Sequence, residues 1–196
     1  MSAASAPTGV PLTDSTRRWL VALARRTVRS GLDDGELHLP DHDDVPSDAA
    51  APGAAFVTLR RDGRLLGCIG SLEPVRPLAD DVAAHAYDAA FRDPRLPAVT
   101  LDDWSHMDVE VSVLGPLERI DVHDRGELAD ALRPGIDGVL LTSKEGRGTF
   151  LPSVWGQVGS PDRFLDELWR KAGLRRRRWP DDLVVERYQV DEFGDG

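Results

Sequence analysis

Hydrophobic and polar positions repeat along this chain, and the clearest pattern predicts a hairpin followed by a helix. Residues 55–60 (AFVTLR) have strand composition, and Asp62-Gly63 is a strong signal for a two-residue turn. Residues 64–70 (RLLGCIG) then form the returning strand, and Pro77 is well placed as the first residue of a helix with a small apolar stripe. Strand, glycine-framed cysteine, short loop and helix together predict the floor of a pocket.

The start of the chain combines a polar leader with a helical period. Residues 1–12 are rich in Ala, Ser, Pro and Gly and are predicted to be a disordered leader. Thr13 or Asp14 then caps a predicted helix that stops at Gly31. Residues 33–52 are acidic and rich in turn formers, which indicates a surface loop.

Strict alternation recurs at residues 107–113 (MDVEVSV), which predicts a strand with one apolar and one polar face. Strands and helices do not alternate regularly along the chain, so the fold class is α+β, an antiparallel sheet with packed helices, and not a doubly wound parallel sheet. The remaining predicted elements are a helix at 126–132, a hairpin of 138–142 and 147–151, a helix from 161 to 173 and a closing strand at 183–190.

Composition narrows the function classes. At 196 residues the chain is long enough for one well-buried domain with a smaller lobe. The formal net charge of -10 disfavours broad binding to nucleic acid or to anionic membranes. The single cysteine excludes an internal disulfide, and no segment reads as a signal peptide or membrane span, so a cytoplasmic location is expected.

Seven segments carry a specific resemblance to a known family. The chain resembles the AMMECR1 domain, known in prokaryotes as the A component of the AmmeMemoRadiSam system, over roughly residues 13–193. One departure stands inside the hallmark hexapeptide, where Leu66 replaces the family's arginine. The matching segments are LLGCIG at 65–70, SLEP at 71–74, AFRDPRL at 90–96, VEVSVL at 109–114, LRPG at 132–135, GTFLPSVW at 148–155 and KAGL at 171–174.

The resemblance implies a fold and a setting more than a reaction. It implies an antiparallel sheet with packed helices and a smaller lobe that leaves a cleft. It also implies association with Memo-like and radical-SAM proteins in a shared modification pathway. A radical-SAM cluster inside this chain is excluded because one cysteine cannot hold a cubane of the usual cysteine-rich kind.

Cys68 is the first candidate for chemistry, as a nucleophile, redox thiol or metal ligand. Gly67, Ile69 and Gly70 surround it, and glycines inside a strand indicate a bulge or the close approach of a ligand or another backbone. Strand alternation places Cys68 on the face of Leu66 and Gly70. The competing interpretation is a small buried residue, which is how most free cysteines behave.

Three carboxylates are candidate acids or bases beside Cys68. Glu110 and Asp108 point the same way from their alternating strand, and Glu110 lies in a segment that resembles the family. Glu73 follows the cysteine in the SLEP loop and is a similar candidate. A solvated strand face is the competing interpretation for the two strand residues.

Other polar residues are candidates for ligand binding. Arg92 and Asp93 precede Pro94, where they suit either anion recognition or a structural clasp. Ser153 lies at a pocket or caps a short helix beside a core Trp155. The basic run 175–178 is a solvated loop or a weak nucleic-acid contact.

Metal and cofactor signals are absent from the sequence. The five histidines fall in no recognised metal spacing, and neither HExxH, CxxC nor a Walker loop is present, so no metal ligands and no cofactor are assigned. The leading hypothesis is a small cytoplasmic enzyme or enzyme accessory with Cys68 as the reactive group. The alternative is a non-catalytic binding or scaffold module in which the GCIG segment is needed for packing.

Overall fold

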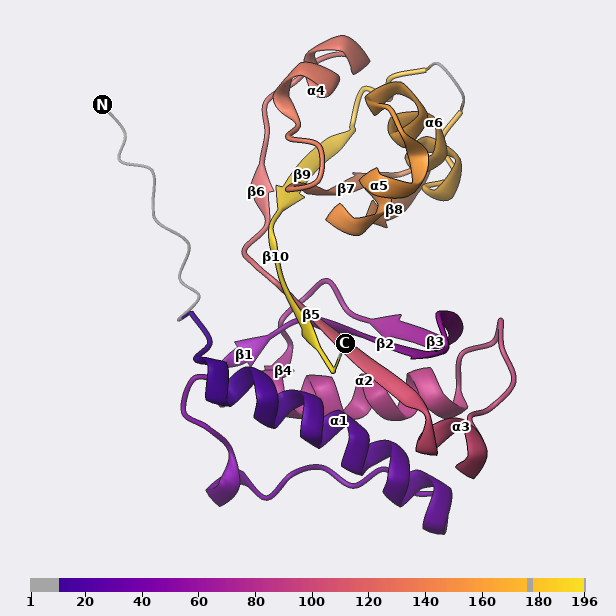
Figure 1. Cartoon of the computed structure of the whole chain (residues 1–196). Helices are drawn as coiled ribbons and strands as arrows, with labels where there is room; N and C mark the ends of the chain where they lie inside the picture. The colour runs from indigo at the N-terminus through magenta and orange to yellow at the C-terminus, as the bar shows by residue number, and fades with distance from the viewer. Residues whose placement is uncertain (1–10, 176–177, 196) are drawn as a thin grey trace. The chain divides into compact units, whose positions relative to one another are not determined.

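The computed structural model describes residues 11–175 and 178–195, and the chain divides into two compact units (Figure 1). The larger unit comprises residues 11–114 and 191–195, and the inserted unit comprises the described residues between them. Each unit has its own four-stranded antiparallel sheet and its own hydrophobic core. The predicted α+β class with antiparallel pairing is confirmed, whereas the cleft implied by the resemblance stays a prediction.

The first helix, α1 (Asp14–Asp34), is longer than predicted. The Thr13 side chain accepts a hydrogen bond from the Thr16 N–H at the start, and Gly35 ends the helix in the left-handed conformation. The predicted stop at Gly31 is wrong, because that glycine lies inside the helix, where an added Cβ would sit 2.4 Å from the Phe91 ring. Gly31 therefore serves helix packing.

The sheet of the larger unit is built around the predicted hairpin. Strand β2 (Ala55–Arg61) pairs with β3 (Arg64–Gly70), and both turn residues, Asp62 and Gly63, have positive φ as a type I′ turn requires. The strand order is β10-β5-β2-β3, with β5 (Met107–Leu114) and β10 (Val190–Gly194) completing the sheet.

Helices α1 and α2 (Leu78–Phe91) cover one face of this sheet (Figure 1). The buried residues of α2 and the inward residues of β2 and β5, such as Val57, Leu59 and Val111, share one core. The unit is completed by the shorter elements η1 (His42–Asp44), β1 (Pro52–Gly53), β4 (Arg76–Pro77) and α3 (Leu101–Ser105).

A bulge in β3 changes which side chains share a face. The register shifts between Leu59 and Arg60, whose partners are Gly67 and Leu65, so Leu66 is the extra residue. Leu66 is buried in the core on the helix side, and it does not share a face with Cys68 as strict alternation predicted. The position that departs from the family hallmark thus holds a core side chain.

The inserted unit repeats the plan of sheet and helices. Its strand order is β6-β9-β7-β8, and Trp155 stacks on Phe164 with ring centroids 3.7 Å apart in the core. The elements are β6 (Glu118–Arg119), α4 (Arg125–Ala131), β7 (Gly138–Ser143), β8 (Gly146–Phe150), η2 (Pro152–Val154), α5 (Trp155–Val158), α6 (Pro161–Lys171) and β9 (Val184–Tyr188).

The chain ends in two strands where the sequence predicted one. The predicted strand 183–190 is β9 of the inserted unit, and after Gln189 the chain continues as β10 in the sheet of the larger unit. The two connections between the units are joined there, because the Gly115 N–H donates to the Gln189 carbonyl at 2.8 Å.

Two further expectations concern the leader at residues 1–12 and the absence of a membrane span. Most of the predicted leader lies outside the described residues, but Leu12, its last residue, is buried in the core of the larger unit. Within the described ranges, no helix combines the length and hydropathy that crossing a membrane requires.

Candidate functional site

Three side chains form a row across the sheet of the larger unit. Cys68 of β3 is paired with Thr58 of β2, and Thr58 is paired on its other side with Glu110 of β5. Paired residues on neighbouring strands project from the same face, so the three side chains share the face opposite the helices. The Thr58 hydroxyl donates to the Cys68 Sγ at 3.3 Å. We call this set, Cys68, Thr58 and Glu110, the polar row.

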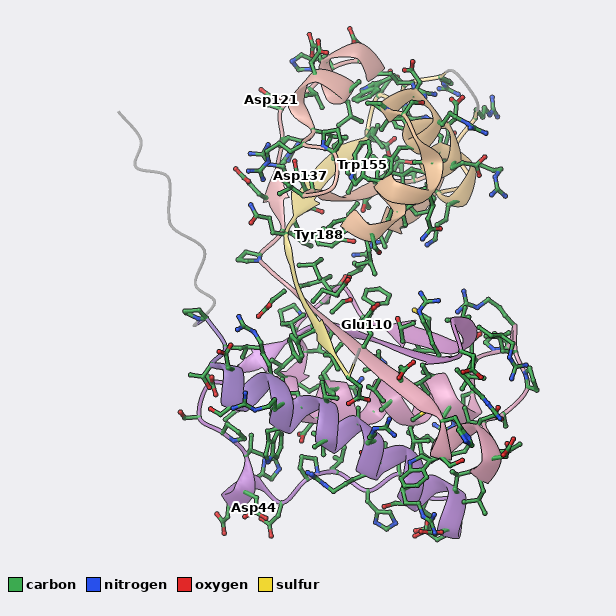
Figure 2. All side chains as sticks on the ribbon, in the orientation of Figure 1. Asp44, Glu110, Asp121, Asp137, Trp155 and Tyr188 are labelled. Atoms are coloured by element: carbon green, nitrogen blue, oxygen red, sulfur yellow. The ribbon has the colours of Figure 1, made fainter. Side chains whose placement is uncertain are left out.

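Glu110 is the titratable member of the row whose pKa is perturbed. Burial raises the pKa of its carboxyl, the nearby Glu192 carboxylate raises it further, and Arg60 partly opposes both. Glu192 also accepts a 3.5 Å hydrogen bond from Ser112, so β10 contributes to the same face. Figure 2 labels Glu110 on its strand. A carboxyl with a raised pKa is better suited to proton transfer than an ordinary exposed glutamate.

The backbone of Cys68 is held by a segment that follows α2. The Cys68 N–H donates to the Asp93 carboxylate at 3.0 Å, and the Cys68 carbonyl accepts from the Arg95 guanidinium at 2.8 Å. Asp93 is buried, and hydrogen bonds from Arg95 and from the Cys68 N–H hold the pKa of its carboxyl well below the ordinary range against the effect of burial. The predicted structural clasp at Asp93 is what the geometry shows.

Arg92, the neighbouring candidate for anion recognition, faces a different environment. Its guanidinium pairs with Asp88 at 3.2 Å and lies 4.9 Å from the Tyr87 ring centroid. Sequence reasoning chose Arg92 and missed Arg95, although both belong to the same AFRDPRL segment. The signal that separates them is their distance from Asp93 in three dimensions, which the sequence does not show.

The residues beside Cys68 serve packing more than an open surface. An added Cβ at Gly67 would lie 1.8 Å from the Ala89 carbonyl oxygen, so the close approach predicted from this glycine is made by α2. Ile69 packs against the core of the larger unit, away from the polar row. At Gly70 an added Cβ would meet the Phe56 ring at 2.3 Å.

The loop after Cys68 is fixed by a buried aspartate that sequence reasoning did not select. Asp81 of α2 is fully buried and accepts hydrogen bonds from the Ala55 N–H at 2.9 Å and from Arg76 at 2.8 Å. The Ser71 hydroxyl also donates to it, at 3.2 Å. Burial opposes ionisation, yet His85 and Arg76 bring the pKa of Asp81 below its ordinary value. Glu73 lies exposed in this loop.

The remaining candidates lie in the inserted unit. Ser153 is exposed in η2 and caps neither η2 nor α5, so the predicted capping role is wrong. Trp155 is buried as predicted, and its indole N–H donates to the Asp137 carbonyl at 2.7 Å. Figure 2 labels both Trp155 and Asp137. Of the basic run, Arg176 and Arg177 lie outside the described residues.

No metal centre is visible in the described part of the chain. Within residues 11–175 and 178–195, no group of three or more His, Cys, Asp or Glu side chains is placed to hold a metal ion. The acidic loop that carries His38 and His42 is mostly exposed, and His38 pairs with Asp34 at 2.7 Å. The polar row therefore remains the candidate site.

The fold and the row define the class of protein. It is an α+β protein in which one antiparallel sheet unit is inserted before the last strand of another, with a cysteine held at a sheet edge. The chain belongs to the AMMECR1 family, whose sequence model matches residues 21–193.

Relatives and a solved structure agree with this assignment. A protein from Methanothermobacter thermautotrophicus is 39% identical over 186 residues, covering 93% of this chain and 96% of its own. A protein from Thermofilum pendens is 38% identical, with 89% and 87% covered. The crystal structure of the uncharacterized protein PH0010 from Pyrococcus horikoshii matches with a TM-score of 0.86 and 33% identity, covering 93% of each chain.

Proposed function

We propose that the polar row is the reactive face of a small cytoplasmic enzyme or enzyme accessory. The observation that supports this most is the pairing of Cys68, Thr58 and Glu110 on three neighbouring strands. A thiol and a proton-transfer group at such a spacing, about 10 Å between the outer Cα atoms, suit a small polar ligand lying across the sheet.

Each member of the row has a distinct part in this proposal. Cys68 is the group that attacks or captures the ligand, because a thiolate is the strongest nucleophile among common side chains near neutral pH. Glu110 accepts or delivers a proton on the ligand, since its pKa is raised by burial and by Glu192. The Thr58 hydroxyl, 3.3 Å from Sγ, orients the sulfur.

Family membership supplies the proposed setting. The resemblance to the A component of the AmmeMemoRadiSam system supports a role beside Memo-like and radical-SAM proteins in a modification pathway. The inserted unit, with its own core, offers a second surface for such partners. Nucleic acid is a poor partner for a chain of net charge -10.

The reactive face is tested by the alkylation rate of Cys68. Because the chain has a single thiol, iodoacetamide reports on that residue alone. Faster reaction of the native protein than of the urea-unfolded chain near neutral pH is expected for an activated, accessible thiol. Protection until unfolding would contradict the proposal.

The second candidate is a scaffold module, and the contact between Gly67 and Ala89 favours it. A segment packed so tightly has a structural reason to exist without any chemistry. The scaffold predicts that Cys68→Ala lowers thermal stability and binding to a Memo-like partner together. The reactive face predicts an intact fold and partner complex with loss of the product that the reconstituted system forms.

A further inference from the structure

Cys68 lies on an edge strand, where its backbone has no neighbouring strand on one side. Among the described residues the sheet order is β10-β5-β2-β3, so β3 is terminal and pairs with β2 alone. Edge strands present unpaired N–H and C=O groups. At Cys68 both groups are satisfied by Asp93 and Arg95 instead of by another strand.

Asp93 and Arg95, which we call the clip, are themselves held in one geometry. Arg95 Nε donates to Asp93 Oδ1 at 2.8 Å and Nη2 donates to Asp93 Oδ2 at 2.6 Å, which is the two-pronged arrangement of a strong arginine–carboxylate pair. The Arg95 backbone N–H also donates to Asp93, at 3.1 Å. Pro94 between them restricts the backbone further. The clip is therefore rigid where it meets Cys68.

Burial differs sharply between the two clip residues. The Asp93 side chain is 2% exposed and both its oxygens are engaged, whereas the Arg95 side chain is 60% exposed. The positive charge of the pair therefore lies on the outer side, next to Cys68. The pKa of Arg95 is raised mainly by Asp93, with a smaller contribution from Cys68.

We propose that Asp93 and Arg95 are the positioning residues of Cys68, because Asp93 holds its backbone N–H while Arg95 holds its carbonyl and places a positive charge beside it. This inference rests on the proposed reactive face and assigns to it a residue, Arg95, that sequence reasoning did not select. A fixed backbone sets the direction of the Cα–Cβ bond, and hence the direction in which the sulfur meets a ligand. A neighbouring cation stabilises the charged sulfur over the neutral thiol.

The test uses the full chain and three variants at one segment. Arg95→Gln removes the charge, Arg95→Lys keeps it without the two-pronged geometry, and Arg92→Gln is the matched control, because Arg92 pairs with Asp88 instead. Iodoacetamide alkylation of Cys68 is followed from pH 5 to 9 and at low and high salt. Circular dichroism establishes that each variant is folded.

The expected result is a rate near neutral pH about fivefold lower in Arg95→Gln, with the rate profile moved to higher pH. Arg95→Lys restores part of the rate, and Arg92→Gln leaves it unchanged. Salt slows the wild-type reaction more than that of Arg95→Gln, because screening weakens the charge interaction. If Arg95→Gln does not fold, the Arg95→Lys rate and the wild-type salt dependence carry the test.

Failure of the clip is distinguishable from failure of the reactive face. A folded Arg95→Gln variant with the wild-type rate, pH profile and salt dependence overturns the clip, even where native Cys68 reacts faster than the unfolded chain. A native thiol that reacts no faster than the unfolded one contradicts the reactive face, and the ratio between wild type and Arg95→Gln still reports on the clip.

Discussion

The hairpins β2–β3 and β7–β8 follow the same plan in the two units and differ in how their polar groups are used. Each ends a four-stranded antiparallel sheet, and each presses a glycine onto backbone near a helix. An added Cβ would lie 1.8 Å from the Ala89 carbonyl at Gly67 and 2.0 Å from the Ala172 carbonyl at Gly146. Packing is thus common to both hairpins and does not mark a functional site.

The polar groups of the second hairpin are closed by hydrogen bonds with Tyr188 of the neighbouring strand β9. Thr149 Oγ1 lies 2.7 Å from the Tyr188 hydroxyl and donates to the Val139 carbonyl at 2.9 Å, and the Tyr188 hydroxyl lies 3.2 Å from the Phe150 carbonyl. Burial raises the pKa of Tyr188 to about 12, against a smaller effect from Thr149. Such a network stabilises the fold and offers no group to a ligand.

The polar row of the first hairpin is open by comparison. The Cys68 sulfur has the Thr58 hydroxyl as its partner, and among the described residues no hydrogen bond reaches the Glu110 carboxyl. The buried polar groups of one sheet are thus satisfied by one another, whereas in the other sheet the Glu110 carboxyl accepts no hydrogen bond from the described residues. A candidate site is therefore distinguished from a core by whether its polar groups already have hydrogen-bond partners, and less by the architecture around them.

The largest effect is expected at the packing that the two hairpins share. Gly67→Ala forces a methyl group into the α2 backbone, so we expect a loss of about 3 kcal/mol or more in unfolding free energy. Gly156→Ala is the matched control, because nothing lies within 4 Å of an added Cβ there. Urea unfolding measures both, and a wild-type midpoint for Gly67→Ala would contradict the close approach.

Breaking the clip is expected to have the next largest effect. Asp93→Asn removes a carboxylate whose pKa is lowered in the fold, and we expect a loss of about 2 kcal/mol at pH 7. A lowered pKa means that this stabilisation is present above the unfolded value of about 3.9 and is lost as the pH falls toward the folded one. The difference in unfolding free energy between wild type and Asp93→Asn should therefore narrow as the pH falls from 5 to about 2. Urea unfolding midpoints measure it.

Removing one polar group from each of the two sheets sharpens the comparison directly. Tyr188→Phe takes a buried hydroxyl from a closed network, and we expect it to lower the unfolding free energy by about 1 kcal/mol. Cys68→Ala removes a partly exposed sulfur with one weak hydrogen bond, and a loss below about 0.5 kcal/mol is expected. Equal losses of unfolding free energy in the two variants would contradict the contrast between an open and a closed set of polar groups.

The last effect has the opposite sign. Glu110→Gln removes a carboxyl whose raised pKa makes ionisation costly in the fold, so the variant should be more stable than wild type at pH 7 by up to about 1 kcal/mol. The folded state binds the Glu110 proton more tightly than the unfolded state. The wild type therefore loses stability as the pH rises from the ordinary pKa of a glutamate to the raised one. The gain should vanish near pH 4, and Asp108→Asn, at an exposed position of the same strand, serves as the control in thermal unfolding.

Local sequence signals predicted much of the fold. The Asp62-Gly63 turn and the Thr13 cap are set by residues within three positions of one another, and both are found in the structure. The stop at Gly31 was predicted by the same local logic and is wrong, because ring contacts from α2 decide that position. Local rules therefore fail where distant packing overrides them.

The candidate site depends on contacts that a single sequence does not show. The polar row joins residues 10 and 52 positions apart, since Thr58 meets both Cys68 and Glu110. Cys68 and Glu110 were predicted from residue type and motif, but the role of Thr58 and Arg95 required the strand register and the path of the chain after α2. The bulge at Leu66 likewise reversed a face assignment that alternation alone made.

The final strand has a consequence for the order of biosynthesis. Because β10 pairs beside β5 in a sheet begun more than 100 residues earlier, this sheet is complete only when residues 190–194 have left the ribosome. The inserted unit, synthesised between the two, has all its strands before that moment. Loss of residues 190–194 alone would therefore disturb the sheet that was synthesised first and spare the sheet that was synthesised later.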